Sequence, residues 1–160
     1  MKIGIMGGTF NPIHNAHLLI AEMAREEYGL DRVIFITDGN PPHKSANVTA
    51  KQRFEMTHIA IADNNAFEED DFEINRSEKS YTVNTLGYLK EKYPNNDLFF
   101  IIGEDSLNDF DKWYKPDKIL EMCSLLVFPR KSLKSLTETI KVVKEKMNGR
   151  IFPISAPVFR

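Results

Sequence analysis

The feature that most constrains the fold is a short, continuous apolar run at residues 3–6, which leads through Gly7-Gly8 into a helical pattern over about 17–28. A run without polar alternation favours a strand covered on both faces, as in parallel sheets. Glycines have no Cβ, so an anion can approach the backbone N–H groups there, and a helix N-terminus attracts negative charge. The segment therefore predicts a strand, a phosphate-sized loop and a helix, an arrangement suited to a triphosphate.

The same alternation continues along the chain. Further apolar runs lie at residues 33–36, 98–102 and 125–128, and weaker ones at 72–74 and 151–154. Helical patterns lie between them, at about 50–62, 81–93 and 132–147. We expect a Rossmann-like, doubly wound α/β fold: a mainly parallel sheet of five to six strands with helices on both faces. The charged run at 68–71 is expected to be an exposed turn, and Ser80 is expected to cap the helix that follows it.

Composition narrows the class of protein. The 160 residues suit a single domain, and a formal net charge of −2 offers no basic patch for nucleic acid. No apolar run is long enough for a membrane span, and strand-like sequence begins at once, so neither a membrane nor a signal peptide is expected. The single cysteine, Cys123, starts an apolar strand, which favours a reducing, cytoplasmic location and argues against a covalent mechanism.

The string from Gly7 to His17, G-G-T-F-N-P-I-H-N-A-H, is far more specific than any of its parts. It is neither the dinucleotide fingerprint nor a P-loop. It resembles the H-x-G-H motif of the nucleotidyltransferase superfamily, and within it the bacterial nicotinate mononucleotide adenylyltransferases of NAD synthesis. Ala16 stands where glycine is usual, and Asn11 where aspartate is frequent. The resemblance implies catalytic roles for His14 and His17 and substrate binding by Gly7, Gly8, Thr9 and Phe10.

A second segment, residues 40–44, follows the second expected strand and reads N-P-P-H-K. In open α/β sheets, ligands bind at the carboxyl ends of the strands, where this segment begins. The family has a similar P-P-H-[KR] segment. The resemblance implies a catalytic role for Lys44 and substrate contacts from Asn40 and His43.

Two further segments resemble the family's acceptor-binding segments. Residues 80–86 read S-Y-T-V-N-T-L, which in the family binds the nicotinate carboxylate through the turn that corresponds to Thr82. From the sequence alone, simple helix capping is the favoured interpretation of this turn. Residues 113–115 read W-Y-K, which implies that Trp113 stacks on the pyridine ring, with Tyr114 beside it.

The adenosine side resembles the family in the G-E-D-S segment at residues 103–106. It implies contacts from Gly103 and Asp105 to the adenosine part of ATP. Arg130 matches an arginine of the family near the phosphates, although Lys131 replaces the proline that usually follows.

The activity implied is adenylyl transfer from ATP to nicotinate mononucleotide, giving deamido-NAD and pyrophosphate. Mg²⁺ is expected to accompany ATP, bound mainly through water, and no protein metal ligands are expected. The expected binding partners are thus ATP and nicotinate mononucleotide, and whether the chain forms a homo-oligomer is left open. Nicotinamide mononucleotide and phosphopantetheine are the alternative acceptors.

A catalytically impaired nucleotide-binding module is the alternative from a different class. The family continues beyond the position of Arg160 into an I-S-S-T-x-x-R segment that binds phosphates. We therefore expect residues 1–160 to form a single nucleotidyltransferase domain that is incomplete at its C-terminus relative to the family, and whether this form is active is left open.

Overall fold

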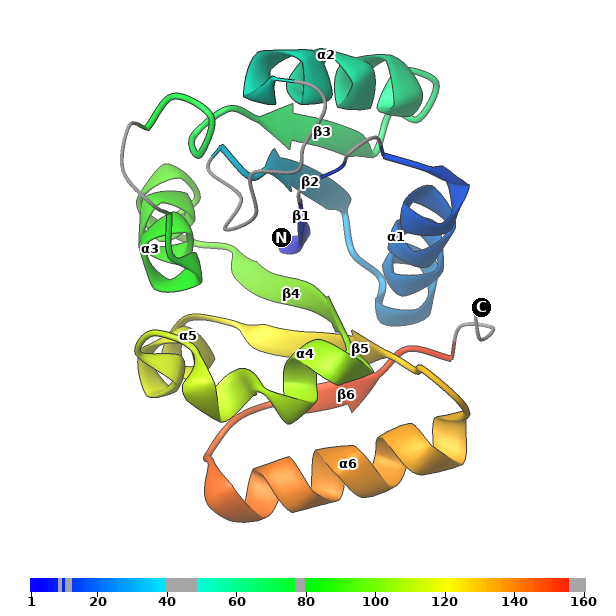
Figure 1. Ribbon diagram of the computed structural model, residues 1–160, viewed down its shortest axis with the longest axis vertical. Coiled ribbons are helices and arrows are strands. Elements are labelled where there is room, and N and C mark those ends of the chain that lie inside the picture. Colours follow the sequence, from blue (N-terminus) through cyan, green and yellow to red (C-terminus); the bar gives the residue numbers. More distant parts are fainter. Residues whose placement is uncertain (9, 11–12, 40–48, 77–79, 156–160) are drawn as a thin grey trace.

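A computed structural model describes residues 1–8, 10, 13–39, 49–76 and 80–155 (Figure 1). Within these residues, six strands form one sheet in which all neighbouring strands are parallel, in the order β3-β2-β1-β4-β5-β6. The strands are β1 (Lys2–Gly8), β2 (Arg32–Thr37), β3 (Phe67–Asp70), β4 (Asp97–Gly103), β5 (Ser124–Phe128) and β6 (Ile151–Pro153). The expected doubly wound α/β fold is confirmed.

Helices cover both faces of the sheet. They are α1 (Asn15–Tyr28), α2 (Ala50–Ile61), α3 (Thr82–Lys92), α4 (Glu104–Asn108), α5 (Pro116–Met122) and α6 (Leu133–Lys146), with a 3₁₀ turn, η1 (Phe110–Lys112). Alternate residues of the inner strands β1, β2, β4 and β5 enter two separate cores, one shared with α1 and α2 and the other with α3 to α6. In β1, for example, Ile5 belongs to the core under α3 while Met6 belongs to the core under α1. Burial on both faces explains the continuous apolar runs.

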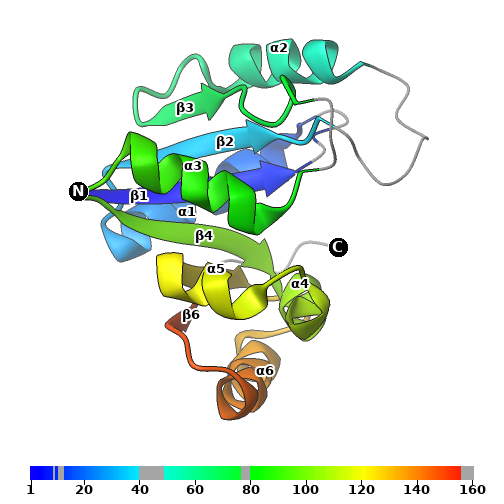
Figure 2. The same ribbon diagram turned by 90° about the vertical axis from the view of Figure 1, so that its left-hand side faces the viewer.

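The strand order reverses between β1 and β4, because the chain crosses from the β3 edge through α3 to begin β4 beside β1. The strands all point toward the same edge of the sheet (Figure 2). Ligands of open α/β sheets bind outside the carboxyl ends of the strands at such a reversal. Gly7-Gly8 and Gly103 end these two strands, so both predicted glycine segments lie there.

Two predictions near the β3 edge are wrong. Residues 72–74 form a turn, and the strand lies earlier, at Phe67–Asp70, within the charged run that was expected to be an exposed turn. The charges suit an edge strand that pairs only with β2, because charged side chains protect an open edge from further pairing. Asp70 is 5% exposed and accepts hydrogen bonds from Tyr88 and Lys92 of α3, which allows a carboxylate to be buried.

Local details of the helices also differ from the predictions. Tyr81, rather than Ser80, is the N-cap residue of α3. The short helices α4 and α5 were not expected, because each is too short to show a clear apolar period. No helix in the described part of the chain is both long and apolar enough to cross a membrane.

Candidate functional site

Three cavities follow one another along the carboxyl edge of the sheet. The histidine cavity, of about 390 Å³, is lined by His14, His17, Gly103, Asp105 and Arg130 among others. The central cavity, of about 240 Å³, is lined by Gly7, His17, Gly103 and Trp113 among others. The aromatic cavity, of about 250 Å³, is lined by Ser80, Tyr81, Thr82, Trp113 and Tyr114 among others. His17 and Gly103 line the first two cavities and Trp113 lines the last two, so the three cavities are neighbours along this edge.

The start of α1 fixes the orientation of His17. The backbone N–H of His14 donates to Nδ1 of His17 at 3.2 Å, and the two rings lie 4.0 Å apart between centroids. Since Nδ1 accepts a hydrogen bond, the neutral ring carries its proton on Nε2. Burial, and then the neighbouring His14, lower the pKa of His17 to about 4. At neutral pH this imidazole is therefore an uncharged hydrogen-bond donor in the wall of the cavities.

Phe10 supports this histidine from the other side. Its ring meets that of His17 edge-on at 5.3 Å, and its side chain is 3% exposed. The backbone of Phe10 has φ of 49°, a left-handed conformation that is costly for a bulky residue. A Cβ at Gly8 would lie 3.0 Å from the Phe10 ring. Gly8 thus makes room for Phe10, a packing role that the sequence did not reveal, and neither of the two lines the cavities.

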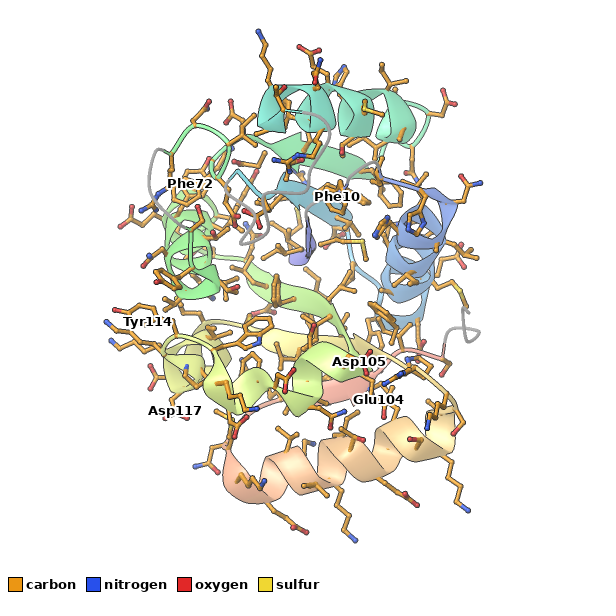
Figure 3. The ribbon with its side chains drawn as sticks, viewed as in Figure 1. Phe10, Phe72, Glu104, Asp105, Tyr114 and Asp117 are labelled. Carbon is orange, nitrogen blue, oxygen red and sulfur yellow. The ribbon has the colours of Figure 1, made fainter. Side chains whose placement is uncertain are left out.

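Residues of α4 and residues after β5 also line the histidine cavity. Glu104 and Asp105 lie at the start of α4 (Figure 3). The guanidinium of Arg130 pairs with Asp105 at 3.1 Å, and both side chains are about two-thirds exposed. The backbone N–H of Arg130 donates to the Glu104 carboxylate at 3.1 Å. The missing side chain of Gly103 leaves space for the Phe128 ring, which would lie 2.9 Å from a Cβ. Gly103 and Asp105, which we predicted to contact the adenosine part of ATP, therefore lie together with Arg130, which we predicted near the phosphates.

Glu104 is a residue of the site that sequence reasoning missed. It is 6% exposed and lines the histidine cavity. Besides Arg130, it accepts hydrogen bonds from Ser135 and Thr139 of α6. Those two hydroxyls lie more than 30 residues away in the sequence, so no local pattern could have revealed that they meet one carboxylate.

The aromatic cavity forms where α3 begins. Thr82 is the first residue of α3, and the N–H groups of Asn84 and Thr85 return to the carbonyl of Tyr81. By the ordinary geometry of a helix end, the N–H groups of Thr82 and Val83 then point out of the helix. The Ser80 hydroxyl is buried without a hydrogen-bond partner in the described part of the chain.

Aromatic rings form the rest of this cavity. Tyr114 packs on Tyr81 at 4.6 Å between ring centroids. Trp113 is half-buried against Phe110 and Phe100, at 4.9 and 6.1 Å. Trp113 therefore packs against the core and also lines two cavities.

Four predicted residues, Thr9, Asn40, His43 and Lys44, lie outside the described residues. The chain leading to the last three is visible as far as Gly39. The N–H of Asp38 donates to the Gly8 carbonyl at 2.9 Å, and Arg53 donates to the Asp38 carbonyl at 2.6 Å. A Cβ at Gly39 would lie only 2.2 Å from the Glu73 carbonyl oxygen, so this close approach requires glycine.

Metal binding and covalent catalysis by a cysteine are two other kinds of chemistry on which the described residues bear. No group of three or more histidine, cysteine, aspartate or glutamate side chains there converges to hold a metal ion. Cys123 is buried just before β5, at the amino end of that strand, and burial raises the pKa of its thiol to about 12. A thiol held neutral at the opposite edge of the sheet is not a nucleophile for this site.

Comparison with known proteins identifies relatives. Residues 5–157 match the model of the "Cytidylyltransferase-like" family. A "Probable nicotinate-nucleotide adenylyltransferase" of Citrifermentans bemidjiense is 47% identical over 146 residues, which are 89% of this chain and 68% of the relative. A protein of the same description from Pelobacter propionicus is 51% identical over 132 residues, 81% of this chain and 61% of the relative. The chain thus spans about two-thirds of the length of these curated relatives.

Solved structures share the fold. The nicotinic acid mononucleotide adenylyltransferase of Plasmodium falciparum, complexed with NaAD, superposes with a TM-score of 0.78 at 22% identity. The match covers 99% of this chain and 77% of that one. At this identity the likeness supports the fold alone.

Proposed function

The chain belongs to the cytidylyltransferase-like family, among its nicotinate-nucleotide adenylyltransferases, and from this premise we propose that it transfers the adenylyl group of ATP to nicotinate mononucleotide. The products are deamido-NAD and pyrophosphate. The observation that carries the proposal is the row of neighbouring cavities, of which the central one is lined by both His17 and Trp113. At one end, side chains are available to donate hydrogen bonds to phosphate oxygens, and at the other end aromatic rings line the cavity. The cavities lie where the strand order reverses.

The chemistry is an in-line displacement at the α-phosphorus of ATP. A 5′-phosphate oxygen of the acceptor forms the new P–O bond, and the bond to the bridging oxygen of the β-phosphate breaks. That oxygen leaves with pyrophosphate, carrying the electron pair. The attacking phosphate is already ionised at neutral pH, so the protein needs no base and acts by alignment and by neutralising charge.

His17 is suited to neutralising that charge. The hydrogen bond from the His14 amide leaves Nε2–H of His17 as the donor toward phosphoryl oxygens. The low pKa keeps the ring neutral in the free protein, so it does not form a competing ion pair with a carboxylate. A bound triphosphate raises this pKa again, because a nearby negative charge favours the protonated ring. The donor therefore becomes stronger when substrate is present.

Mg²⁺ is proposed to enter with ATP. Of the carboxylates lining the histidine cavity, Asp105 is paired with Arg130 and Glu104 already accepts three hydrogen bonds. This donor set fits an ion that keeps its water shell and binds mainly to phosphates. When bound, Mg²⁺ supplies neutralisation of phosphate charge.

The aromatic cavity is proposed to hold the nicotinate end of the acceptor. The N-terminus of α3 offers backbone donors and a partial positive charge, which favour a carboxylate over a neutral amide. Trp113 offers a flat face to the pyridine ring. This is why we favour nicotinate over nicotinamide mononucleotide.

On the strength of the motifs alone, His43 and Lys44 are proposed to act on the phosphates, and Thr9 and Asn40 to contact the substrates. The single cysteine of the chain supports a reducing compartment, and we propose that the reaction takes place in the cytoplasm.

The test is pyrophosphate release from Mg-ATP with nicotinate mononucleotide, nicotinamide mononucleotide and phosphopantetheine offered in parallel. We expect turnover with the first and little with the others. Preference for either of the others would overturn the acceptor assignment. Binding of ATP without turnover on any acceptor would instead identify a nucleotide-binding module.

A further inference from the structure

Glu104 is an unusual carboxylate for its position at the mouth of a cavity. It is 6% exposed, whereas the adjacent Asp105 is 67% exposed at its side chain. A buried carboxylate is costly unless its oxygens accept hydrogen bonds. Glu104 has three donors: the Arg130 backbone N–H at 3.1 Å, Ser135 Oγ at 3.3 Å and Thr139 Oγ1 at 3.0 Å. All three come from outside α4, so the carboxylate joins α4 to the residues after β5 and to α6.

Arg130 is consequently held by two interactions of very different strength. Its backbone is bound to a buried carboxylate, while its guanidinium pairs with the exposed Asp105 at 3.1 Å. A hydrogen bond from a partly buried N–H to a carboxylate is among the stronger ones. An exposed ion pair contributes little to stability, so its partners exchange easily.

We propose that Glu104 is a positioning residue for Arg130. By fixing the backbone of Arg130 at the mouth of the histidine cavity, it allows the guanidinium to leave Asp105 and bind a phosphate of ATP while the base of the side chain stays in place. This inference rests on the proposed function, because it assigns Arg130 to the ATP phosphates.

The physical advantage is entropic. An arginine whose backbone is already ordered loses less freedom when its guanidinium binds a phosphate. Ser135 and Thr139 take part because they hold Glu104 from α6, one turn apart on the same helix face. The helix α6 therefore contributes to ATP binding without touching the nucleotide.

The first test is Glu104→Gln. The amide keeps the size of the side chain but loses the charge and directs an N–H₂ group at one of its donors. We expect KM for ATP to rise about tenfold, with KM for nicotinate mononucleotide changed less than twofold. The matched control is Glu138→Gln, which removes the same charge from an exposed position on α6 and should leave both values unchanged.

A double-mutant cycle separates positioning from a general structural role. If Glu104 acts through Arg130, Glu104→Gln should have almost no further effect on KM for ATP in an Arg130→Ala background. An equal effect in both backgrounds would overturn the inference. Should Glu104→Gln fail to fold, Thr139→Val removes one donor to the carboxylate and should raise KM for ATP in the same direction by about two- to threefold, again only when Arg130 is present. No rise would count against the inference.

A readout without turnover distinguishes failure of the inference from failure of the proposed function. Hydrogen exchange of the Arg130 amide should be at least tenfold faster in Glu104→Gln, while amides in β5 stay protected. ATP affinity, measured by calorimetry, should fall in parallel. If the wild-type protein transfers no adenylyl group but these two changes occur, the positioning role stands and the proposed function fails. Unchanged exchange and affinity would refute the positioning role whatever the activity.

Discussion

Two of the helices that begin at the site, α1 and α3, begin in different ways. At α1, the His14 amide donates to His17 Nδ1, so a side chain of the first turn is held by the backbone and one proton is aimed outward. The first turn of α3 has no capping side-chain hydrogen bond, and the Ser80 hydroxyl next to it has no partner among the described residues. One helix start presents an oriented imidazole, and the other presents backbone donors.

This difference separates chemistry from binding. An imidazole fixed by a neighbouring amide suits a role in the transition state, where a misplaced donor costs rate. Backbone donors at a helix end suit recognition of a fixed anionic group of the substrate. Changes at α1 should therefore reduce kcat, and changes around α3 should raise KM for the acceptor.

The largest expected effect is at the α1 end. His17→Ala should lower kcat about 10²- to 10³-fold, because it removes the oriented Nε2–H donor, with a much smaller change in either KM. Steady-state rates of pyrophosphate release, measured over a range of concentrations of each substrate, give kcat and both KM values. A variant that keeps the full rate, with an unchanged melting temperature, would refute the role of His17 and with it the contrast between the two helices.

On the α3 side, Trp113→Ala should raise KM for nicotinate mononucleotide about tenfold or more, since one aromatic stack contributes about 1–3 kcal/mol. KM for ATP should stay within about twofold. Trp113→Phe keeps a flat ring and should recover most of the affinity. Because Trp113 also packs on Phe110, thermal melting of each variant is needed as a control. A fall in kcat without a change in KM would contradict the division between the two ends.

His17 also makes the stability of the protein depend on pH. Its pKa in the folded protein is about 4, below the ordinary value of 6.5, so the unfolded chain binds the proton more readily between these values. Stability contributed by the neutral ring is therefore complete above about pH 6.5 and is lost as the pH falls to about 4. Allowing for solvent at this half-buried site, the loss should be up to about 2 kcal/mol. Urea unfolding at several pH values, with His17→Asn as the reference, measures it, and identical pH slopes for both proteins would contradict it.

The smallest effect is expected at Ser80. Ser80→Ala removes a buried hydroxyl that has no partner among the residues the structure describes, so the free energy of unfolding should rise by up to about 1 kcal/mol. KM for nicotinate mononucleotide should change less than twofold, because the buried oxygen of this hydroxyl exposes almost no surface to the aromatic cavity that Ser80 lines. Chemical denaturation and steady-state kinetics measure the two quantities. A destabilised variant would show that the hydroxyl is already used within the fold.

The positions of many candidate-site residues were predictable because local sequence decides them. The glycines that end β1 and β4, the histidines at the start of α1 and the threonine at the start of α3 each lie at a strand or helix end that the apolar pattern locates. Parallel strands bring all these ends to one edge of the sheet, so a correct fold places them near each other. Predictions failed where local pattern and tertiary environment disagree, as in the charged run that became the edge strand β3.

The sequence by itself determined the alternation of the long helices α1, α2, α3 and α6 with the strands other than β3, and the motif at the start of α1, because apolar periodicity and glycine placement are local properties of the chain. Only the tertiary structure decided how the side chains are paired. The burial of Asp70 and Glu104 depends on donors that are 18 to 35 residues distant in sequence, and the low pKa of His17 depends on burial in the folded chain. Burying a charge is favourable only when the fold supplies its partners, and a sequence pattern does not show which partners those are.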